Sequence, residues 1–120
     1  MAKYPAAIGP YSAYRVVGDL VFCSGQLPVD PETGNFPCEC IKEQTKQSLK
    51  NVSAILEENG LTLANVVKTT VFLADIADFA AMNEVYGEFF RQPYPARSAF
   101  AVKDLPKGAK VEIEVIASKK

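Results

Sequence analysis

The sequence predicts an α+β fold of two layers, with two helices on one face of a mixed β-sheet. Three observations predict it. The chain has 120 residues, which suits one compact core and is short for two. Segments rich in β-branched residues are mingled with segments whose apolar residues recur every three or four positions. No internal repeat is present, so we expect one domain over residues 1–120.

The first expected element is a β-hairpin. Residues 14–17 and 20–23 are both β-rich, and Gly18-Asp19 between them is typical of a two-residue turn. The following stretch is rich in proline and glycine up to Pro37, which predicts a loop with short extended pieces.

An amphipathic helix is expected next, in a helical pattern that opens at Glu39. Its apolar face has spacings of three and four, which predicts about five turns. Asn59-Gly60 suits the end of this helix, because glycine accepts the left-handed conformation found there. The residues on the apolar face are Ile41, Thr45, Leu49, Val52, Ile55 and Leu56.

A buried strand and a second helix follow. Residues 66–73 are rich in β-branched residues with apolar groups on both parities, which predicts cover on both faces. Asp78 is expected to cap the second helix, and Pro93 and Pro95 forbid its continuation. Its apolar stripe consists of Phe79, Met82, Val85, Tyr86, Phe89 and Phe90, with Asn83 beside it.

Two final strands are expected over residues 97–102 and 110–117. In the last one, Glu112 and Glu114 alternate with apolar residues, so the carboxylates should face away from the side that valine and isoleucine cover. A two-layer domain leaves one sheet face open, and oligomerisation is the natural way to cover an apolar face.

The composition excludes several classes of chemistry. Lys and Arg number 13 against 14 Asp and Glu, which gives a net charge of −1 and argues against a nucleic-acid-binding protein. The chain contains no histidine, which excludes imidazole acid–base catalysis, His-containing metal sites and Ser/His/Asp nucleophile systems.

The cysteines favour a reducing compartment. Cys23, Cys38 and Cys40 are odd in number, so a secreted disulfide framework is not expected, and they are too few for a closed zinc site. We expect Cys23 to be a buried apolar residue and the other two to be incidental thiols. The first residues show no signal-peptide pattern and no apolar run spans a membrane, so the sequence suggests a cytoplasmic protein.

Polar residues at the ends of the expected strands are candidates for a site. Arg97 comes just after Pro95 at the start of a strand, where its planar fork of donors would suit a carboxylate. The alternative is a cross-strand ion pair with Glu112 or Glu114. Ser24-Gly25 could equally be a bulge that turns the chain, and Tyr11, Asn83 and Glu112, taken singly, are more often surface or capping residues.

Taken together, the motifs resemble those of the RidA (YjgF) family of reactive-intermediate deaminases. The resemblance covers residues 7–117, and any one block of it is weak, but their order and spacing are specific. The blocks are Ala7-Ile8-Gly9-Pro10-Tyr11, Ser24-Gly25-Gln26, Gln47-Ser48-Leu49-Lys50-Asn51-Val52, Val67-Lys68-Thr69-Thr70-Val71-Phe72, Pro95-Ala96-Arg97-Ser98 with Phe100, Leu105-Pro106 and Ile113-Glu114.

The resemblance implies a chorismate-mutase-like fold and a homotrimer with an active cleft between each pair of subunits. It also implies hydrolysis, without a cofactor or a metal, of small 2-imino and 2-enamino acids such as 2-aminoacrylate. These substrates are released by pyridoxal-phosphate enzymes, and the products are 2-keto acids and ammonia. No nucleic-acid or membrane partner is expected.

The resemblance also assigns roles to individual residues. Arg97 would clamp the substrate carboxylate with help from the Gly25 N–H, and Glu112 would orient or deprotonate the attacking water. Tyr11 and Ser24 would line and polarise the pocket. Asn83 matches a further functional position, and the Ala99 carbonyl would accept from the imine N–H. Many relatives have cysteine at the position of Ala99, so thiol-dependent regulation there is not expected.

Two other functions stay open from the sequence. A non-catalytic metabolite-binding trimer would keep Arg97 but has no need of Glu112. A ribonuclease or translation inhibitor would require a basic groove with aromatic platforms, for which the charge balance gives little support.

Overall fold

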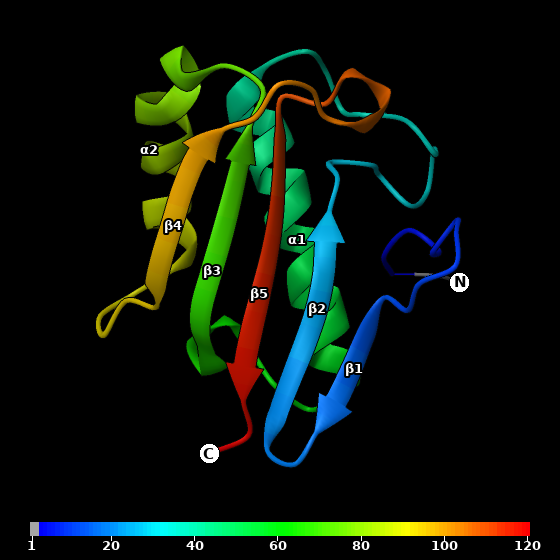
Figure 1. Cartoon of the computed structure of the whole chain (residues 1–120), viewed down its shortest axis with the longest axis vertical. Coiled ribbons are helices and arrows are strands. Elements are labelled where there is room, and N and C mark those ends of the chain that lie inside the picture. The colour runs from blue at the N-terminus through cyan, green and yellow to red at the C-terminus, as the bar shows by residue number, and fades with distance from the viewer. Residues whose placement is uncertain (1–2) are drawn as a thin grey trace.

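A five-stranded mixed sheet with two helices packed on one face forms the framework of the protein (Figure 1). The computed structural model describes residues 3–120. The strands are β1 (Tyr14–Val17), β2 (Leu20–Gln26), β3 (Val66–Leu73), β4 (Ala96–Ala101) and β5 (Val111–Ser118). The helices are α1 (Ile41–Glu58) and α2 (Phe79–Phe89), and 3-10 turns η1 (Leu63–Asn65), η2 (Ile76–Asp78) and η3 (Pro106–Gly108) lie between elements.

The strand order across the sheet is β1-β2-β5-β3-β4. Only β3 and β4 are parallel, and α2 forms the crossover between them. The β1–β2 hairpin closes through Gly18, whose φ of +59° is one that glycine adopts without strain. The predicted α+β class and the order of elements are confirmed.

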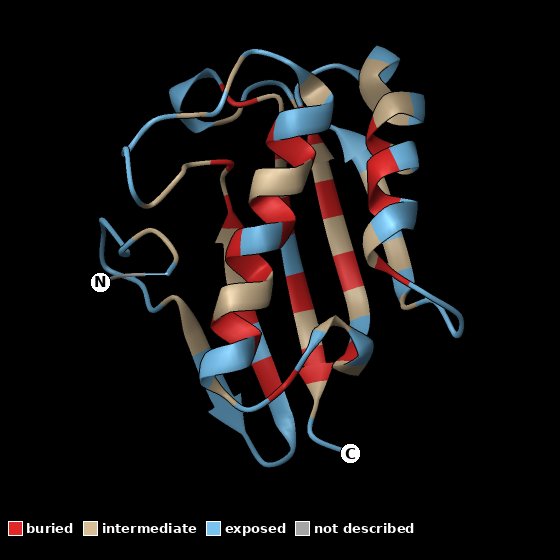
Figure 2. Ribbon diagram, turned by 180° about the vertical axis from the view of Figure 1, so that it is seen from behind, coloured by how far each residue is buried: buried red, intermediate tan, exposed pale blue. Residues whose placement is uncertain are grey.

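The core lies between the sheet and the helices. Burial alternates along β3 and β5, which lie beneath the helices (Figure 2). Val71, Leu73, Val111 and Ile113 are fully buried. On the opposite face Phe72 is only half-buried and Phe100 is exposed. The helices pack on one side only, as the two-layer prediction requires, so a single copy of the chain does not supply the predicted cover on the second face of β3.

The start of α2 also differs from expectation. Asp78 is its N-cap residue but makes no side-chain capping hydrogen bond. The cap belongs instead to the preceding turn η2, where the Asp75 carboxylate accepts from the Ala77 N–H at 2.9 Å. Two aspartates three positions apart both match the N-cap pattern, and the short turn makes the first one the capping residue.

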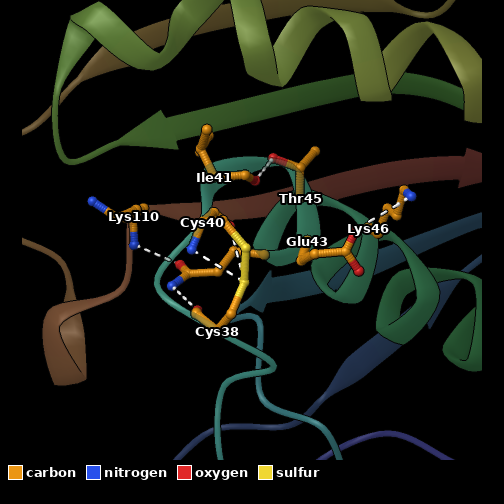
Figure 3. The surroundings of a disulfide bond; sticks show 8 residues. Cys38, Cys40, Ile41, Glu43, Thr45, Lys46 and Lys110 are labelled. Atoms are coloured by element: carbon orange, nitrogen blue, oxygen red, sulfur yellow. Dashed lines mark hydrogen bonds and ion pairs between the residues drawn. A yellow bond between two sulfur atoms is a disulfide. The ribbon is translucent and has the colours of Figure 1, made fainter.

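The prediction for the cysteines is correct for Cys23 and wrong for Cys38 and Cys40. Cys23 is buried, as expected. Cys38 and Cys40, expected as incidental thiols, are instead joined by a disulfide just before α1 (Figure 3). Their Cα atoms are 5.4 Å apart, within the range a disulfide needs. Among residues 3–120 no cluster of His, Cys, Asp or Glu could hold a metal ion, and no helix has the length and hydrophobicity of a bilayer crossing.

Candidate functional site

A cavity of about 680 Å³ lies where the segment before β1 (the N-terminal arm, residues 5–13), the end of β2 and the start of β5 meet. Its walls include four of the residues singled out from the sequence: Tyr11, Ser24, Gly25 and Glu112. We call it the Glu112 cleft. The remaining walls are mostly apolar and come mainly from residues 5–8 and the loop after β2, with Pro106 and Lys107 of η3. The cleft therefore offers a few polar groups in mostly apolar surroundings.

Irregularity in β2 places Ser24 and Gly25 in this cleft. The pairing of β2 with β5 shifts register between Cys23 and Gln26, which is a β-bulge at Ser24-Gly25. The Ser24 side chain donates to the Ser12 carbonyl at 2.6 Å, and its N–H donates to the Ala13 carbonyl at 2.9 Å. The bulge interpretation of Ser24-Gly25 is therefore correct, and the bulge also forms part of the cleft.

Buried polar residues of α1 hold the loop that continues the cleft wall. The Ser48 hydroxyl donates to the Gln26 carbonyl at 2.7 Å. The Asn51 amide donates to the carbonyls of Leu27 and Val29 at 3.1 and 2.9 Å. Both side chains are fully buried, although helical periodicity left them off the predicted apolar face. Buried polar side chains in a helix are hydrogen-bonded, and here they anchor a loop. In the sequence, such a serine or asparagine looks the same as one on the surface of the helix.

Glu112 projects from β5 toward Gly25. A Cβ atom built on Gly25 would overlap one carboxylate oxygen of Glu112 and lie 3.0 Å from its carboxyl carbon. Only glycine allows this close approach. Burial raises the pKa of Glu112 above its ordinary value, and the charge of Glu114 adds to the effect.

Arg97 and Asn83 form a separate group beside α2. The Arg97 guanidinium donates to the Asn83 side-chain oxygen at 2.6 Å. Its central carbon lies 4.7 Å from the ring centroid of Tyr86 and 5.5 Å from that of Phe79. We call Asn83, Tyr86 and Phe79 the Arg97 cradle. Rings near a guanidinium stabilise its charge through their quadrupoles and restrict its orientation.

A hydrogen bond to β3 holds the Tyr86 ring of the Arg97 cradle in place. The Tyr86 hydroxyl and the hydroxyl of Thr69 share a hydrogen bond of 2.8 Å, and Thr69 is fully buried. Thr69 is also the register partner of Arg97 in the parallel pair of β3 and β4. Thr69 therefore fixes the position of Arg97 through strand pairing and that of Tyr86 through its side-chain hydrogen bond. Tyr86 and Phe79 were predicted only as core residues of α2.

The described residues offer Arg97 no carboxylate partner. All ion pairs found among residues 3–120 involve lysines, and the cross-strand pair with Glu112 or Glu114 is absent. The sheet explains why. Thr69, the register partner of Arg97, faces the helices, whereas Glu112 pairs with Phe72 on the open face. Arg97 is thus a half-buried cation held by neutral groups, which leaves it free to bind an anion.

Ala99 lies two residues beyond Arg97 on the same face of β4 and pairs with Val71. The structure therefore brings the predicted site residues together as two groups. One is the Glu112 cleft, with Tyr11, Ser24 and Gly25. The other, at the β4 edge, holds Arg97, Asn83 and Ala99.

Comparison with known proteins gives the family. The family model described as Endoribonuclease L-PSP matches residues 1–119. The RutC family protein y4sK of Sinorhizobium fredii is 56% identical over 95% of this chain and 90% of its own length. A human protein named 2-iminobutanoate/2-iminopropanoate deaminase is 47% identical over 97% of this chain and 85% of its own length.

A solved structure agrees in both sequence and fold. The crystal structure of E. coli TdcF with bound serine is 45% identical, with a TM-score of 0.93 over 98% of this chain and 94% of that one. Matches of this extent in the family model, in sequence and in fold show that the chain is a member of the RidA (YjgF) family.

Proposed function

We propose that this protein hydrolyses small 2-imino acids, and the 2-enamino acids that tautomerise to them, to 2-keto acids and ammonia. The observation that carries the proposal is the Arg97 guanidinium, which is held by neutral groups and has no carboxylate partner among residues 3–120. A ligand carboxylate would supply that partner. The relatives named 2-iminobutanoate/2-iminopropanoate deaminase support an imino acid as the ligand.

The chemistry suits the groups present. An imine carbon is already electrophilic, so hydrolysis needs a water molecule placed against it more than a strong base. In this proposal Arg97 holds the carboxylate bidentately, and Glu112 accepts a proton as water attacks the imine carbon. Glu112 passes that proton to the nitrogen, which gives a carbinolamine. Glu112 then relays the hydroxyl proton to the same nitrogen, so that the C–N bond breaks, the C=O bond forms and ammonia leaves. The raised pKa of Glu112 suits a group that both accepts and returns a proton.

The remaining site residues have supporting roles. The Gly25 N–H would assist in binding the carboxylate, and the Ala99 carbonyl would accept from the imine N–H. Tyr11 and Ser24 would line and polarise the pocket, and Asn83 would hold the guanidinium of Arg97 through the hydrogen bond described above. No step in this proposal requires a metal or an organic cofactor.

The complete site in this proposal lies between subunits of a homotrimer. Arg97 and Glu112 are on opposite faces of the sheet, and their register partners on β3, Thr69 and Phe72, are about 10 Å apart along the strand. One small substrate cannot bridge them within a chain. The open face also carries exposed apolar side chains, including Phe22 and Phe100, that a second copy would cover.

The test is to generate 2-iminopropionate in the assay from an amino-acid oxidase and alanine, in buffer containing EDTA. The decay of the imine is followed with and without the protein, with ammonia and pyruvate measured directly. We expect faster decay with stoichiometric products, unaffected by EDTA. Binding of the keto acid without faster decay would instead favour the non-catalytic metabolite-binding trimer. Cleavage of RNA with no effect on the imine would favour the ribonuclease.

A further inference from the structure

The exposed disulfide at the start of α1 is separate from both groups of site residues and has no part in the proposed hydrolysis. Cys38 and Cys40 flank a single residue, Glu39, and Cys40 is the N-cap residue of α1 (Figure 3). We propose that this pair is a thiol–disulfide exchange site that takes a low-molecular-weight thiol, and that Gln44 links it to the start of β5.

The sulfur atoms differ in their accessibility. Cys40 is exposed, Cys38 is half-buried, and Cys23 lies in the core with 6% exposure. Burial also raises the pKa of the Cys23 thiol to about 12, which keeps it protonated and unreactive at neutral pH. An incoming thiolate therefore has access to the pair, and most readily to the Cys40 sulfur, while Cys23 is an internal control.

The surroundings of Cys38 favour its departure as a thiolate. The Cys40 N–H donates to the Cys38 sulfur at 3.2 Å. The sulfur also lies beside the N-terminus of α1, an 18-residue helix whose unpaired N–H groups and dipole stabilise negative charge. A leaving thiolate that is stabilised in this way accelerates exchange at the other sulfur.

The exchange is balanced in two steps. A thiolate RS⁻ attacks the Cys40 sulfur, the bond between Cys38 and Cys40 breaks, and Cys38 leaves as the thiolate. A second RS⁻ attacks the outer sulfur of the mixed disulfide and releases RSSR and the Cys40 thiolate. Two thiols are oxidised, the protein disulfide is reduced by two electrons, and two protons end on the cysteines. The reverse reaction uses RSSR as the oxidant.

Both states are compatible with the fold. The disulfide closes a ring with one intervening residue, so it restrains little of the unfolded chain and adds little to stability. It also precedes α1, whose N-cap makes no side-chain capping hydrogen bond that cleavage would remove. An accessible disulfide that closes so short a ring behaves as an exchangeable group and not as a structural crosslink.

Gln44 connects the pair to the strand that carries Glu112. Its side-chain nitrogen donates to the Cys38 carbonyl at 2.9 Å, and its side-chain oxygen accepts from the Lys110 N–H at 2.8 Å (Figure 3). Gln44 is fully buried, so neither group can exchange its partner for bulk water. Opening the disulfide frees the Cys38 backbone, and the change reaches Lys110 through this one side chain.

The exchange is tested on the whole protein in buffers of reduced and oxidised glutathione at set ratios. Samples are quenched with acid, alkylated and analysed by peptide mass spectrometry. We expect one reversible two-electron transition at Cys38 and Cys40, with Cys23 alkylated only after denaturation. Brief exposure of the disulfide-bonded protein to reduced glutathione, followed by acid quench, should trap the mixed disulfide on Cys40, with the free thiol on Cys38. A pair that stays oxidised in excess glutathione, or a mixed disulfide found mainly on Cys38, would overturn the proposal.

The link is tested by ¹⁵N NMR of the oxidised and reduced protein. The Lys110 amide should shift between the two forms, and so should the side-chain amide of Gln44. The amide of Val16, on the far edge strand β1, should stay in place and report that the fold is intact. A Lys110 amide that does not move would refute the link through Gln44. Neither measurement depends on imine hydrolysis.

Discussion

Arg97 and Glu112 lie on opposite faces of one sheet, on strands that flank β3. Arg97 lies on the helix-covered face beside α2, and Glu112 points into the cleft formed by the N-terminal arm. Within one chain, Arg97 and Glu112 are therefore too far apart to contact the same small molecule. A site that uses both would have to combine Arg97 of one copy with Glu112 of another.

Mixed assemblies provide a direct test of that arrangement. Arg97→Ala and Glu112→Gln should each be nearly inactive alone. Co-expressed with different tags and purified over both, they should recover about a third of wild-type activity. Each mixed trimer, whichever variant is in the majority, has one cleft of three that pairs an intact Arg97 with an intact Glu112 of the neighbouring subunit. Mixing Arg97→Ala with the double variant is the matched control and should recover nothing. Equal activities in the two mixtures would place the site within one chain.

Arg97→Lys separates geometry from charge. Lysine keeps the positive charge but lacks the planar fork, so kcat/KM should fall about ten- to a hundredfold, equivalent to roughly 1.5 to 3 kcal/mol. The melting temperature should change little, since Arg97 has no ionic partner among the described residues. A lower melting temperature with unchanged kcat/KM would show that Arg97 is structural.

Glu112→Gln should lower kcat on the order of a hundredfold, as expected for loss of a general base. In the wild-type protein, kcat/KM should fall as the pH is lowered toward the raised pKa of Glu112, because only the ionised form accepts a proton. This dependence should be absent from the residual activity of the variant. An unchanged kcat would reduce Glu112 to a surface carboxylate.

Glu112→Gln should lower kcat but raise stability at neutral pH. A carboxyl whose pKa is raised by folding binds its proton more tightly in the folded state, so its favourable contribution exists at low pH and disappears as pH rises through the folded value. Ionised Glu112 therefore destabilises the fold at neutral pH. The melting temperature of Glu112→Gln should exceed that of the wild type at pH 7, and the gain should vanish near about pH 4. A lower melting temperature at pH 7 would contradict this.

Tyr86 should affect binding more than turnover. Tyr86→Leu removes the ring beneath Arg97 and should raise KM on the order of fivefold, equivalent to about 1 kcal/mol, with kcat nearly kept. Tyr86→Phe keeps the ring and should restore KM. Phe90→Leu is the control, because Phe90 stacks on Tyr86 with centroids 4.5 Å apart and is buried in the core. It should lower the melting temperature without changing KM.

Gly25→Ala should displace the Glu112 carboxylate. The added methyl group would occupy the space that the carboxylate fills, so kcat should fall toward that of Glu112→Gln. In a Glu112→Ala background the same substitution should cost little further stability, because the obstructing group is gone. Additive losses in the double variant would show that the two residues do not interact.

Much of the fold follows from local pattern. The hairpin around Gly18-Asp19, both amphipathic helices and the alternation that turns Glu112 away from Val111 and Ile113 are predictable, because each depends on neighbours within a few positions. The capping of η2 by Asp75 is not, because Asp78 matches the same N-cap pattern three residues later.

The site is predictable only as a set of residues, not as an arrangement. Motif resemblance selected Tyr11, Ser24, Gly25 and Glu112, and the structure brings these four into one cleft. The division between that cleft and Arg97 depends on strand order, in which β5 and β4 are separated by β3. Nothing local in the sequence encodes that order. The contact of Tyr86 with Arg97 cannot be predicted from the sequence either, because the ring equally fits the apolar stripe of α2.

Helix α2 is both the crossover that makes β3 and β4 parallel and the source of every side chain in the Arg97 cradle. A transient detachment of this one helix would therefore remove the anion-binding geometry while the antiparallel strands stay paired. Apparent ligand affinity would then scale with the fraction of molecules in which α2 is docked. Substitutions on the far side of α2, remote from any ligand, would weaken binding by lowering that fraction, and amide exchange along the helix would report their effect.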